Sequence, residues 1–369
     1  MGCDLFSLAI EGVQGLHPYQ PGKPVDELER ELGITNIVKL ASNENPLGPS
    51  SKALKAIESS FQDLCRYPDG GGFKLKTALS ERYGTEVKQV TLGNGSNDLL
   101  EIIARTFADN TSEIVFSQYA FAVYPLVTQS IGAKAVEVPA VDWGHDLTAM
   151  ANAITDKTKL VFIANPNNPT GTYVSQSDLV CFLNSVPPHV VVVLDEAYCE
   201  YIEENQQDFP DGVALLPNYP NLIVTRTFSK AWGLASLRVG YALSHPDIAD
   251  LLNRVRQPFN VDTFALEAAT AVLTDHEYLV LSRKTNSEGM QQLTSGFERM
   301  GLDYISSVGN FVTFDTGRDG IAVYQALLEQ GVIVRPVSNY GMAQHLRVSI
   351  GLQKENERFL GALAEVLGK

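Results

Sequence analysis

The sequence lacks several features that would place it in a class at once. It has four cysteines in 369 residues, Cys3, Cys65, Cys181 and Cys199, and no CxxC pair. None of them stands near a histidine at the spacing of zinc ligands, so we expect reduced thiols and no metal site. No apolar run approaches the length of a membrane span.

Positive charge is also scarce. Lys and Arg number 28 against 43 Asp and Glu, a formal net charge of −15. Nucleic acids and anionic membranes need a basic surface, so we expect neither as a partner. The start, MGCDLFSLAIEG, has no basic segment and no long apolar stretch, and its sixth residue is not the Ser or Thr of a myristoylation signal. We therefore expect no signal peptide, no lipid anchor and a cytoplasmic protein.

Two nucleotide-binding motifs are missing. A GxxxxGK[ST] loop occurs nowhere, which argues against an ordinary P-loop NTPase. The turn Gly93-Asn94-Gly95 lacks the third glycine of a dinucleotide fingerprint, and the next strand ends in Ser117-Gln118 instead of an acidic residue. An NAD site is therefore not expected.

Apolar, β-branched runs alternate with helical patterns over much of the chain. We expect strands at Gln89–Leu92, Glu113–Phe116, Lys134–Val138, Leu160–Ala164, Val190–Leu194, Leu222–Thr225 and Val239–Leu243. Such alternation predicts an α/β protein with a mostly parallel, seven-stranded sheet sandwiched by helices. The run VVVVL at 190–194 is apolar throughout, as in a central parallel strand.

From about residue 265 the pattern changes to long helical stretches and the short strands FVTFD, VIVRPV and HLRVSIG. This change predicts a smaller α+β domain. The Pro- and Gly-rich segment before Asn45 reads as a strap over other structure. We therefore expect a large ligand-binding domain over 46–264, and a small domain made of 265–369 together with the strap 1–45.

Polar residues follow the expected strands, at the sheet edge where parallel α/β proteins bind ligands. Gly95, Ser96 and Asn97 open a helix, whose N-terminal N–H groups can bind an anion. Asp195 follows the VVVVL strand and can pair with a cationic ring nitrogen. Asn168 lies in the loop NPNNPTG, where an amide can donate to a phenolate. Each of these, taken alone, is equally typical of a tight turn or a cap.

Lys230 follows the strand at 222–225, in the stretch RTFSK, and Arg238 comes eight residues later. Ser, Thr and Arg are good phosphate donors. A lysine in a confined, partly apolar site beside other cations has a lowered pKa and can attack an aldehyde. A surface lysine is the alternative. Together these groups match pyridoxal 5′-phosphate, which carries a phosphate, a pyridine nitrogen, a 3′ oxygen and an aldehyde.

In this order and spacing the chain resembles the fold type I pyridoxal-phosphate aminotransferases. The matching residues are Asn165–Gly171, Asp195–Tyr198, Ser229-Lys230 and Arg238. The stretches GVQGLHPYQPGKP, KLASNENPLGPS, RYPDG, YAFAVY and HLRVSIG are similar to the histidinol-phosphate aminotransferases of that family, and the likeness covers nearly the whole chain. It implies transamination between L-histidinol phosphate and 2-oxoglutarate in histidine biosynthesis.

The resemblance implies a role for each matching residue. Lys230 would bond to the aldehyde and later shuttle a proton, and Asp195 would keep the pyridine nitrogen protonated. Tyr198 and Asn168 would bind the 3′ oxygen, and Tyr119 would stack on the ring. The residues that would hold the phosphate are Gly95, Ser96, Asn97, Thr227, Ser229 and Arg238.

Other implied roles concern the substrate and a second subunit. Tyr67 would reach the phosphate bound by the other subunit, so a homodimer is implied. The substrate would contact Tyr19, Asn43, Arg335 and Arg347, and Arg347 would bind its carboxylate or phosphate. Alternation in LRVSI, taken by itself, instead predicts a solvent-exposed Arg347.

Three alternatives stay open at this point. The first is an aminotransferase for aromatic amino acids, and the second is a decarboxylase of phosphorylated amino acids, since the same cofactor supports decarboxylation. The third is a scaffold without activity. The presence of Lys230, Asp195 and Arg238 argues against the third.

Overall fold

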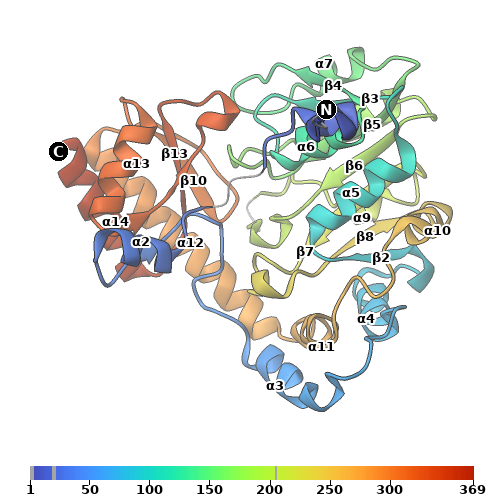
Figure 1. Ribbon diagram of the computed structural model, residues 1–369, viewed down its shortest axis with the longest axis horizontal. Coiled ribbons are helices and arrows are strands. Elements are labelled where there is room, and N and C mark those ends of the chain that lie inside the picture. The colour runs from blue at the N-terminus through green and yellow to red at the C-terminus, as the bar shows by residue number, and fades with distance from the viewer. Residues whose placement is uncertain (1–3, 19–21, 204–205) are drawn as a thin grey trace.

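The computed structural model describes residues 4–18, 22–203 and 206–369, and its largest feature is a seven-stranded sheet (Figure 1). The strands are β2 (Val90–Gly93), β3 (Glu113–Ser117), β4 (Lys134–Val138), β5 (Thr158–Ala164), β6 (Val191–Asp195), β7 (Leu222–Thr227) and β8 (Gly240–Ser244). Their order is β2-β8-β7-β6-β5-β3-β4. Only β8 runs antiparallel to its neighbours, while the other adjacent pairs are parallel. The predicted mostly parallel sheet is confirmed.

The sheet is buried on both faces because its strands carry apolar side chains at successive positions. Along β5, Val161 and Ile163 belong to one apolar core, and Leu160 and Phe162 belong to a second. The covering helices are α3 (Ser51–Ser59), α4 (Phe73–Tyr83), α5 (Ser96–Phe107), α6 (Val123–Ser130), α7 (Leu147–Asn152), α8 (Gln176–Ser185), α9 (Gly212–Leu215), α10 (Pro246–Val255) and α11 (Thr263–Val272). The sheet therefore lies between two helical layers.

A smaller sheet lies beside the first and has its own apolar core. Its antiparallel order is β12-β13-β10-β9, with β9 Tyr304–Ile305, β10 Phe311–Asp315, β12 Arg335–Pro336 and β13 His345–Ser349. The helices packed around it are α12 (His276–Met300), α13 (Gly320–Glu329) and α14 (Gln353–Leu367). Figure 1 shows α12 running from the smaller sheet towards α11.

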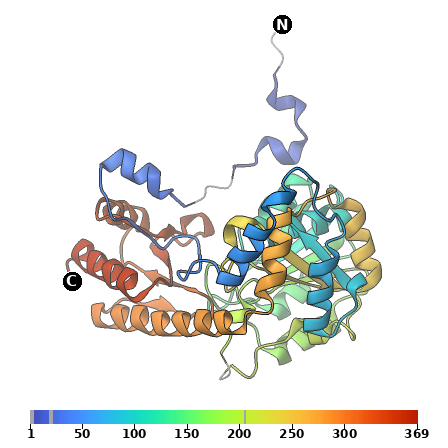
Figure 2. The ribbon, with the colours of Figure 1, turned by 90° about the horizontal axis from the view of Figure 1, so that it is seen from below.

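The N-terminal segment follows an extended course over both parts of the molecule (Figure 2). Its helix α1 (Glu11–Gln14) contacts α6, while α2 (Val25–Leu32) lies near the smaller sheet and the strand β1 (Val38–Lys39) pairs with β11 (Val332–Ile333). Tyr19, expected to contact substrate, lies outside the described residues. Within the described ranges, the helices are too short or too polar to cross a membrane.

Candidate active site

A cavity of about 190 Å³ lies at the carboxyl ends of β5, β6 and β7, between the two sheets. The loops and strand ends that line it carry most of the residues expected from the sequence. Those that line it are Asn43, Ser96, Asn97, Asn168, Asp195, Tyr198, Thr227, Ser229, Lys230, Arg238, Arg335 and Arg347. The structure thus brings together residues spread over some 300 positions of the chain.

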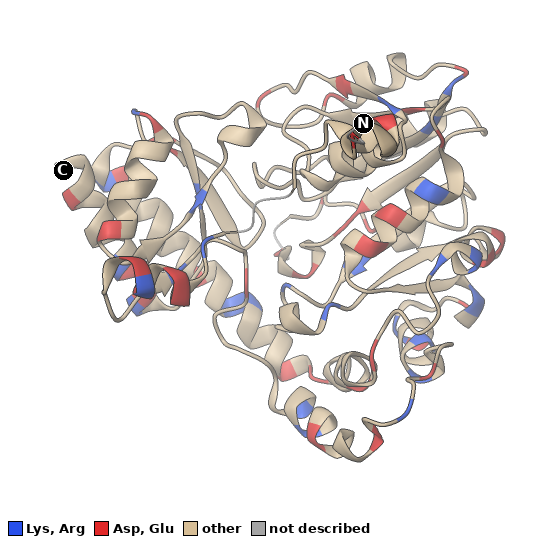
Figure 3. Cartoon of the chain, in the orientation of Figure 1, with Lys and Arg blue, Asp and Glu red and all other residues tan. Residues whose placement is uncertain are grey.

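The charge of this cavity is opposite to that of the protein. Its described lining includes four cations, Lys230, Arg238, Arg335 and Arg347, and one carboxylate, Asp195. The formal net charge of the whole chain is −15. Basic residues are scattered along the chain in Figure 3, so the local excess arises because distant segments meet here. A small anion is the ligand that such a cavity favours.

The first turn of α5 and the guanidinium of Arg238 form a cradle for an anion. Gly95 has a φ of +86°, and a Cβ at this position would lie 2.5 Å from Nη2 of Arg238. Arg238 also donates from Nη1 to Oγ of Ser229, at 3.3 Å. The N–H groups that open α5 have no partner within the helix and point at the same place. This arrangement suits a phosphate.

Asp195 is buried at the end of β6. It accepts hydrogen bonds from Oη of Tyr124, at 3.0 Å, and from Oγ1 of Thr225, at 3.1 Å. Burial raises the pKa of Asp195 to about 6, and the two hydrogen bonds oppose this rise. A cationic ring nitrogen placed beside it would compensate the buried charge.

Tyr198 offers a hydroxyl that two amides fix in place. Its Oη accepts from Nδ2 of Asn43, at 2.9 Å, and from Nδ2 of Asn168, at 3.1 Å. Burial raises the pKa of Tyr198 to about 12, so the hydroxyl keeps its proton at neutral pH and can donate it in a hydrogen bond. A phenolate oxygen of a bound ring is a suitable acceptor.

Arg347 is buried, with 7% of its surface exposed, so the exposure expected from strand alternation is wrong. Its Nη1 donates to Oδ1 of Asn168, and its Nη2 donates to the carbonyl of Ala41 at 2.8 Å. The reason is that β13 is an interior strand whose polar face turns towards the larger sheet instead of solvent. The pattern identifies a polar face but not what covers it.

Lys230 is positioned by the turn that follows β7. Its Nζ donates to the carbonyl of Ser42 at 3.1 Å and lies 5.7 Å from the ring centre of Tyr198. Burial, together with the positive charges of Arg347 and Arg238 and against the opposing effect of Glu44, lowers the pKa of Lys230 to about 7. A large fraction of the amine is therefore neutral near pH 7, which a nucleophile requires.

Of the YAFAVY stretch, the aromatic residue that lines this cavity differs from the one expected. Tyr119 lines an adjoining cavity of about 760 Å³, and its ring centre lies 5.2 Å from that of Trp143. Phe121 lines the cavity that contains Asp195 and Lys230. The stacking role of Tyr119 stays a prediction, and Phe121 is a residue that the sequence reasoning missed. The stretch YAFAVY signals aromatic rings here but does not tell which ring faces the ligand.

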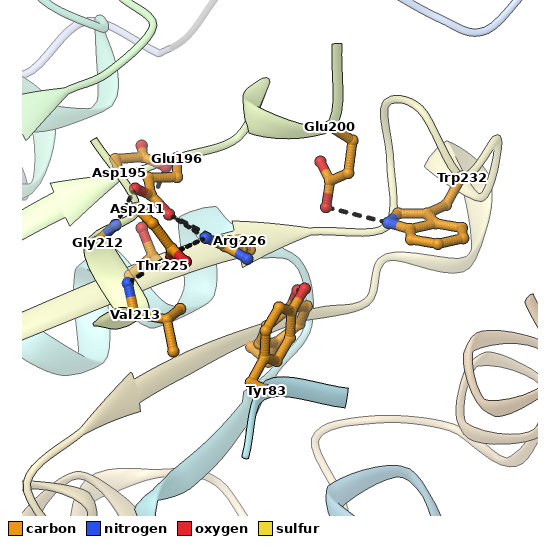
Figure 4. Close-up of polar contacts among 11 residues, drawn as sticks. Tyr83, Asp195, Glu196, Glu200, Asp211, Gly212, Val213, Thr225, Arg226 and Trp232 are labelled. Carbon is orange, nitrogen blue, oxygen red and sulfur yellow. Dashed lines mark hydrogen bonds and ion pairs between the residues drawn. The ribbon is translucent and has the colours of Figure 1, made fainter. Parts of the chain in front are cut away.

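Arg226, in the RTFSK stretch, faces away from the cavity. Strand β7 continues through Thr227, beyond the expected end at Thr225, so Arg226 is a strand residue whose neighbours Thr225 and Thr227 face the opposite side. Its guanidinium forms an ion pair with Glu196, with Nη2 2.6 Å from Oε2 (Figure 4). Arg226 is therefore not a phosphate donor.

Tyr67 lies outside this cavity and is 82% exposed. Its ring stacks on Phe259 with centres 4.7 Å apart, and the carbonyl of Gly70, in the same loop, accepts from Nη2 of Arg256 at 2.8 Å. The loop thus holds Tyr67 in a defined outward position. Among the described residues, no group of three or more His, Cys, Asp or Glu side chains is arranged to hold a metal ion.

Comparison with known proteins agrees with this geometry. Residues 35–363 match the model of the aminotransferase class I and II family. The chain belongs to this family. Histidinol-phosphate aminotransferase 2 of Pseudomonas fluorescens is 61% identical over the full length of both chains, and histidinol-phosphate aminotransferase 1 of Nitrosococcus oceani is 57% identical over 98% of this chain and 97% of its own.

Solved structures of aminotransferases have the same fold. The histidinol-phosphate aminotransferase of Sinorhizobium meliloti, solved in complex with pyridoxal 5′-phosphate, has a TM-score of 0.90 at 30% identity and covers 99% of each chain. An aspartate aminotransferase of Thermus thermophilus has a TM-score of 0.84 at 22% identity, covering 96% of this chain and 98% of its own, a likeness of fold alone.

Proposed function

We propose that this aminotransferase uses pyridoxal 5′-phosphate to move the amino group of L-histidinol phosphate to 2-oxoglutarate, giving imidazole acetol phosphate and L-glutamate. The observation that carries the proposal is a single cavity that joins an anion cradle, a buried carboxylate, a fixed tyrosine hydroxyl and a lysine with a lowered pKa. These four groups fit the phosphate, ring nitrogen, 3′ oxygen and aldehyde of the cofactor. The named relatives support the choice of substrate.

When bound, pyridoxal 5′-phosphate supplies an aldehyde that takes up an amino group and a ring that accepts the electrons released at Cα. The protein supplies position and proton transfer. Lys230 Nζ would accept the proton from the substrate's Cα and hold it for return during the transfer. Asp195 would keep the ring nitrogen protonated through its negative charge, and Tyr198 would donate to the 3′ oxygen.

Arg335 and Arg347 are the two arginines that line the cavity from the smaller sheet. Arg238 and the first turn of α5 are assigned to the cofactor's phosphate, which leaves these two arginines on the side of the smaller sheet. L-histidinol phosphate carries a phosphate, and 2-oxoglutarate carries two carboxylates. Guanidinium groups bind both kinds of anion through paired hydrogen bonds. The same pair can therefore serve both half-reactions.

Arg335→Gln is expected to weaken use of the phosphorylated substrate by about 10- to 100-fold in kcat/KM, because a hydrogen bond to a charged group contributes about 1.5–3 kcal/mol. The measurement is a single-turnover half-reaction that follows the absorbance of the bound cofactor. L-histidinol, which lacks the phosphate, is the matched control substrate and should lose much less. Equal losses on both substrates would remove Arg335 from phosphate recognition.

The same assay, run on the wild type with L-phenylalanine, tests the aromatic alternative. A faster half-reaction with L-phenylalanine than with L-histidinol phosphate would assign the protein to the aromatic aminotransferases. L-Histidinol phosphate has no carboxylate, so the decarboxylase alternative is tested with a phosphorylated amino acid such as L-phosphoserine, from which carbon dioxide would be released.

A homodimer is the second part of the proposal, with Tyr67 contributed to the partner's cofactor phosphate. The outward position of Tyr67 supports this, as do the exposed apolar side chains of Phe61, Leu64 and Phe73, which are close to it in the sequence. Such a patch is typical of a surface covered by another chain.

Tyr67→Phe is expected to leave the dimer intact and to weaken cofactor binding by about tenfold, the value of one hydrogen bond to a phosphate. Light scattering would give the mass, and titration of the cofactor-free protein would give the dissociation constant. Tyr219→Phe, which removes a hydroxyl that donates to Asn184 at 2.9 Å outside the cavity, is the control. A monomer at micromolar concentration, or unchanged affinity in Tyr67→Phe, would contradict the proposal.

A further inference from the structure

A second group of buried polar side chains lies where β6 and β7 end (Figure 4). Arg226 donates from Nε to Oε2 of Glu196 at 2.8 Å, and the two side chains are 9% and 0% exposed. The guanidinium also lies 4.9 Å from the ring centre of Tyr83, whose hydroxyl is 2.6 Å from that of Tyr241. These side chains do not line the cavity.

The ion pair joins the ends of the two strands that carry the cavity's key groups. Glu196 directly follows Asp195, and Arg226 stands between Thr225 and Thr227. Thr225 is the residue that donates to Asp195, and Thr227 lines the cavity. Successive side chains of a strand point to opposite faces. Each member of the pair is therefore next in sequence to a cavity residue whose side chain points to the other face.

A second buried contact joins the segments that follow the same two strands. Nε1 of Trp232 donates to Oε1 of Glu200 at 3.1 Å, and both residues are buried. Glu200 lies two residues after Tyr198, and Trp232 lies two residues after Lys230. This contact therefore joins the turn that follows β6 to the turn that follows β7, as Figure 4 shows.

Stability is a weak explanation for such a pair. Removing two charges from water costs several kcal/mol, and well-packed apolar residues of similar volume often serve as well or better. What an ion pair and a single-donor indole contact supply is direction, because both require defined geometry. Both contacts join the same two parts of the chain. One part is the end of β6 with the turn that follows it, and the other is the end of β7 with its following turn.

We propose that Arg226, Glu196, Glu200 and Trp232 are positioning residues that set the separation of Asp195 from Lys230. The inference rests on the proposed function, since it concerns where a ring would be held between a carboxylate and an amine. None of the four lines the cavity. Their effect passes through the backbone of the β6 and β7 ends.

The test removes both partners of each contact together, so that neither partner is left as an unpaired buried charge. The double variant Arg226→Met/Glu196→Leu removes both members of the ion pair, and Trp232→Phe with Glu200→Gln removes the second contact. The control is Glu113→Gln, a largely buried carboxylate at the opposite end of the same sheet, bonded to Lys134 at 2.8 Å. Three quantities are measured: the melting temperature, the dissociation constant of pyridoxal 5′-phosphate for the cofactor-free protein, and the pH midpoint of the bound cofactor's absorbance.

Positioning predicts that both double variants bind the cofactor at least tenfold more weakly and shift the pH midpoint by about one unit, with kcat lowered more than KM is raised. The Glu113→Gln control should keep the wild-type midpoint and affinity. A lower melting temperature with unchanged midpoint and affinity would show a structural role alone and overturn the inference. If one double variant does not fold, the other decides. A wild-type protein that binds no cofactor would instead refute the proposed function.

Discussion

Lys230→Met is expected to lower kcat by about 10⁴-fold or more, because the variant loses the group proposed to move the proton at Cα, and general acid–base catalysis contributes about 10²–10⁴-fold. Loss of the amine that bonds to the aldehyde adds to this effect. The cofactor should still bind, since the anion cradle of Arg238 and α5 is unchanged. Single-turnover kinetics with L-histidinol phosphate would measure the loss.

The fold should survive this substitution and become more stable near neutral pH. The folded pKa of Lys230, about 7, lies below the ordinary value of 10.5 because of burial. The unfolded chain therefore binds the proton more tightly, and the wild-type free energy of unfolding rises as pH increases from 7 to 10.5. In cofactor-free protein the gain from Lys230→Met should reach at most about 5 kcal/mol below pH 7 and vanish near pH 10.5.

Lys76→Met is a matched control for the lysine. Burial also lowers the pKa of Lys76, to about 8, but the side chain lies on α4 and does not line the cavity. This control should keep kcat within a fewfold of the wild type. Turnover of Lys230→Met within tenfold of the wild type would show that the lysine does not carry the chemistry.

Asp195→Asn is expected to lower kcat by about 10²–10³-fold, the usual effect of removing one group placed to stabilise developing charge. The amide has nearly the same shape but no negative charge, so the ring nitrogen would no longer be held protonated. Tyr124 and Thr225 donate to different oxygens of Asp195, Oδ2 and Oδ1, so the amide keeps an acceptor for only one of them. The measurement is kcat together with the absorbance spectrum of the bound cofactor.

The pH dependence of stability gives an independent check on Asp195. Its folded pKa, raised to about 6 by burial, exceeds the ordinary 3.8, so its contribution to stability is lost as pH rises through 6. At pH 8 the free energy of unfolding of cofactor-free Asp195→Asn should therefore exceed that of the wild type by up to about 3 kcal/mol, as measured by denaturant unfolding. At pH 4 the two proteins should show no such difference. Asp275→Asn, a buried cap of α12, is the control. An Asp195→Asn enzyme with normal kcat would contradict the role.

The sequence predicted the sheet and most of the cavity because both depend on local patterns. Apolar runs located all seven strands, and polar residues after β5, β6 and β7 met at one edge as parallel topology requires. What the local patterns could not give depended on tertiary contact. The burial of Arg347 arises from a neighbouring sheet, and Arg226 contacts Glu196 on a strand that continues two residues beyond its expected end. The path of the loop alone determines that Phe121 lines the cavity with Lys230 and that Tyr119 lines the adjoining one.

The division of the cavity between two sheets has a consequence for turnover. The residues assigned to the cofactor belong to the larger sheet and its loops, whereas Arg335 and Arg347 lie on the smaller sheet and Asn43 is fastened to it through Ser349. A transaminase releases its first product before the second substrate enters. Separation of the two sheets by a small rotation would open the substrate contacts and leave the cofactor contacts intact. The contacts to the cofactor would then persist while imidazole acetol phosphate leaves and 2-oxoglutarate enters.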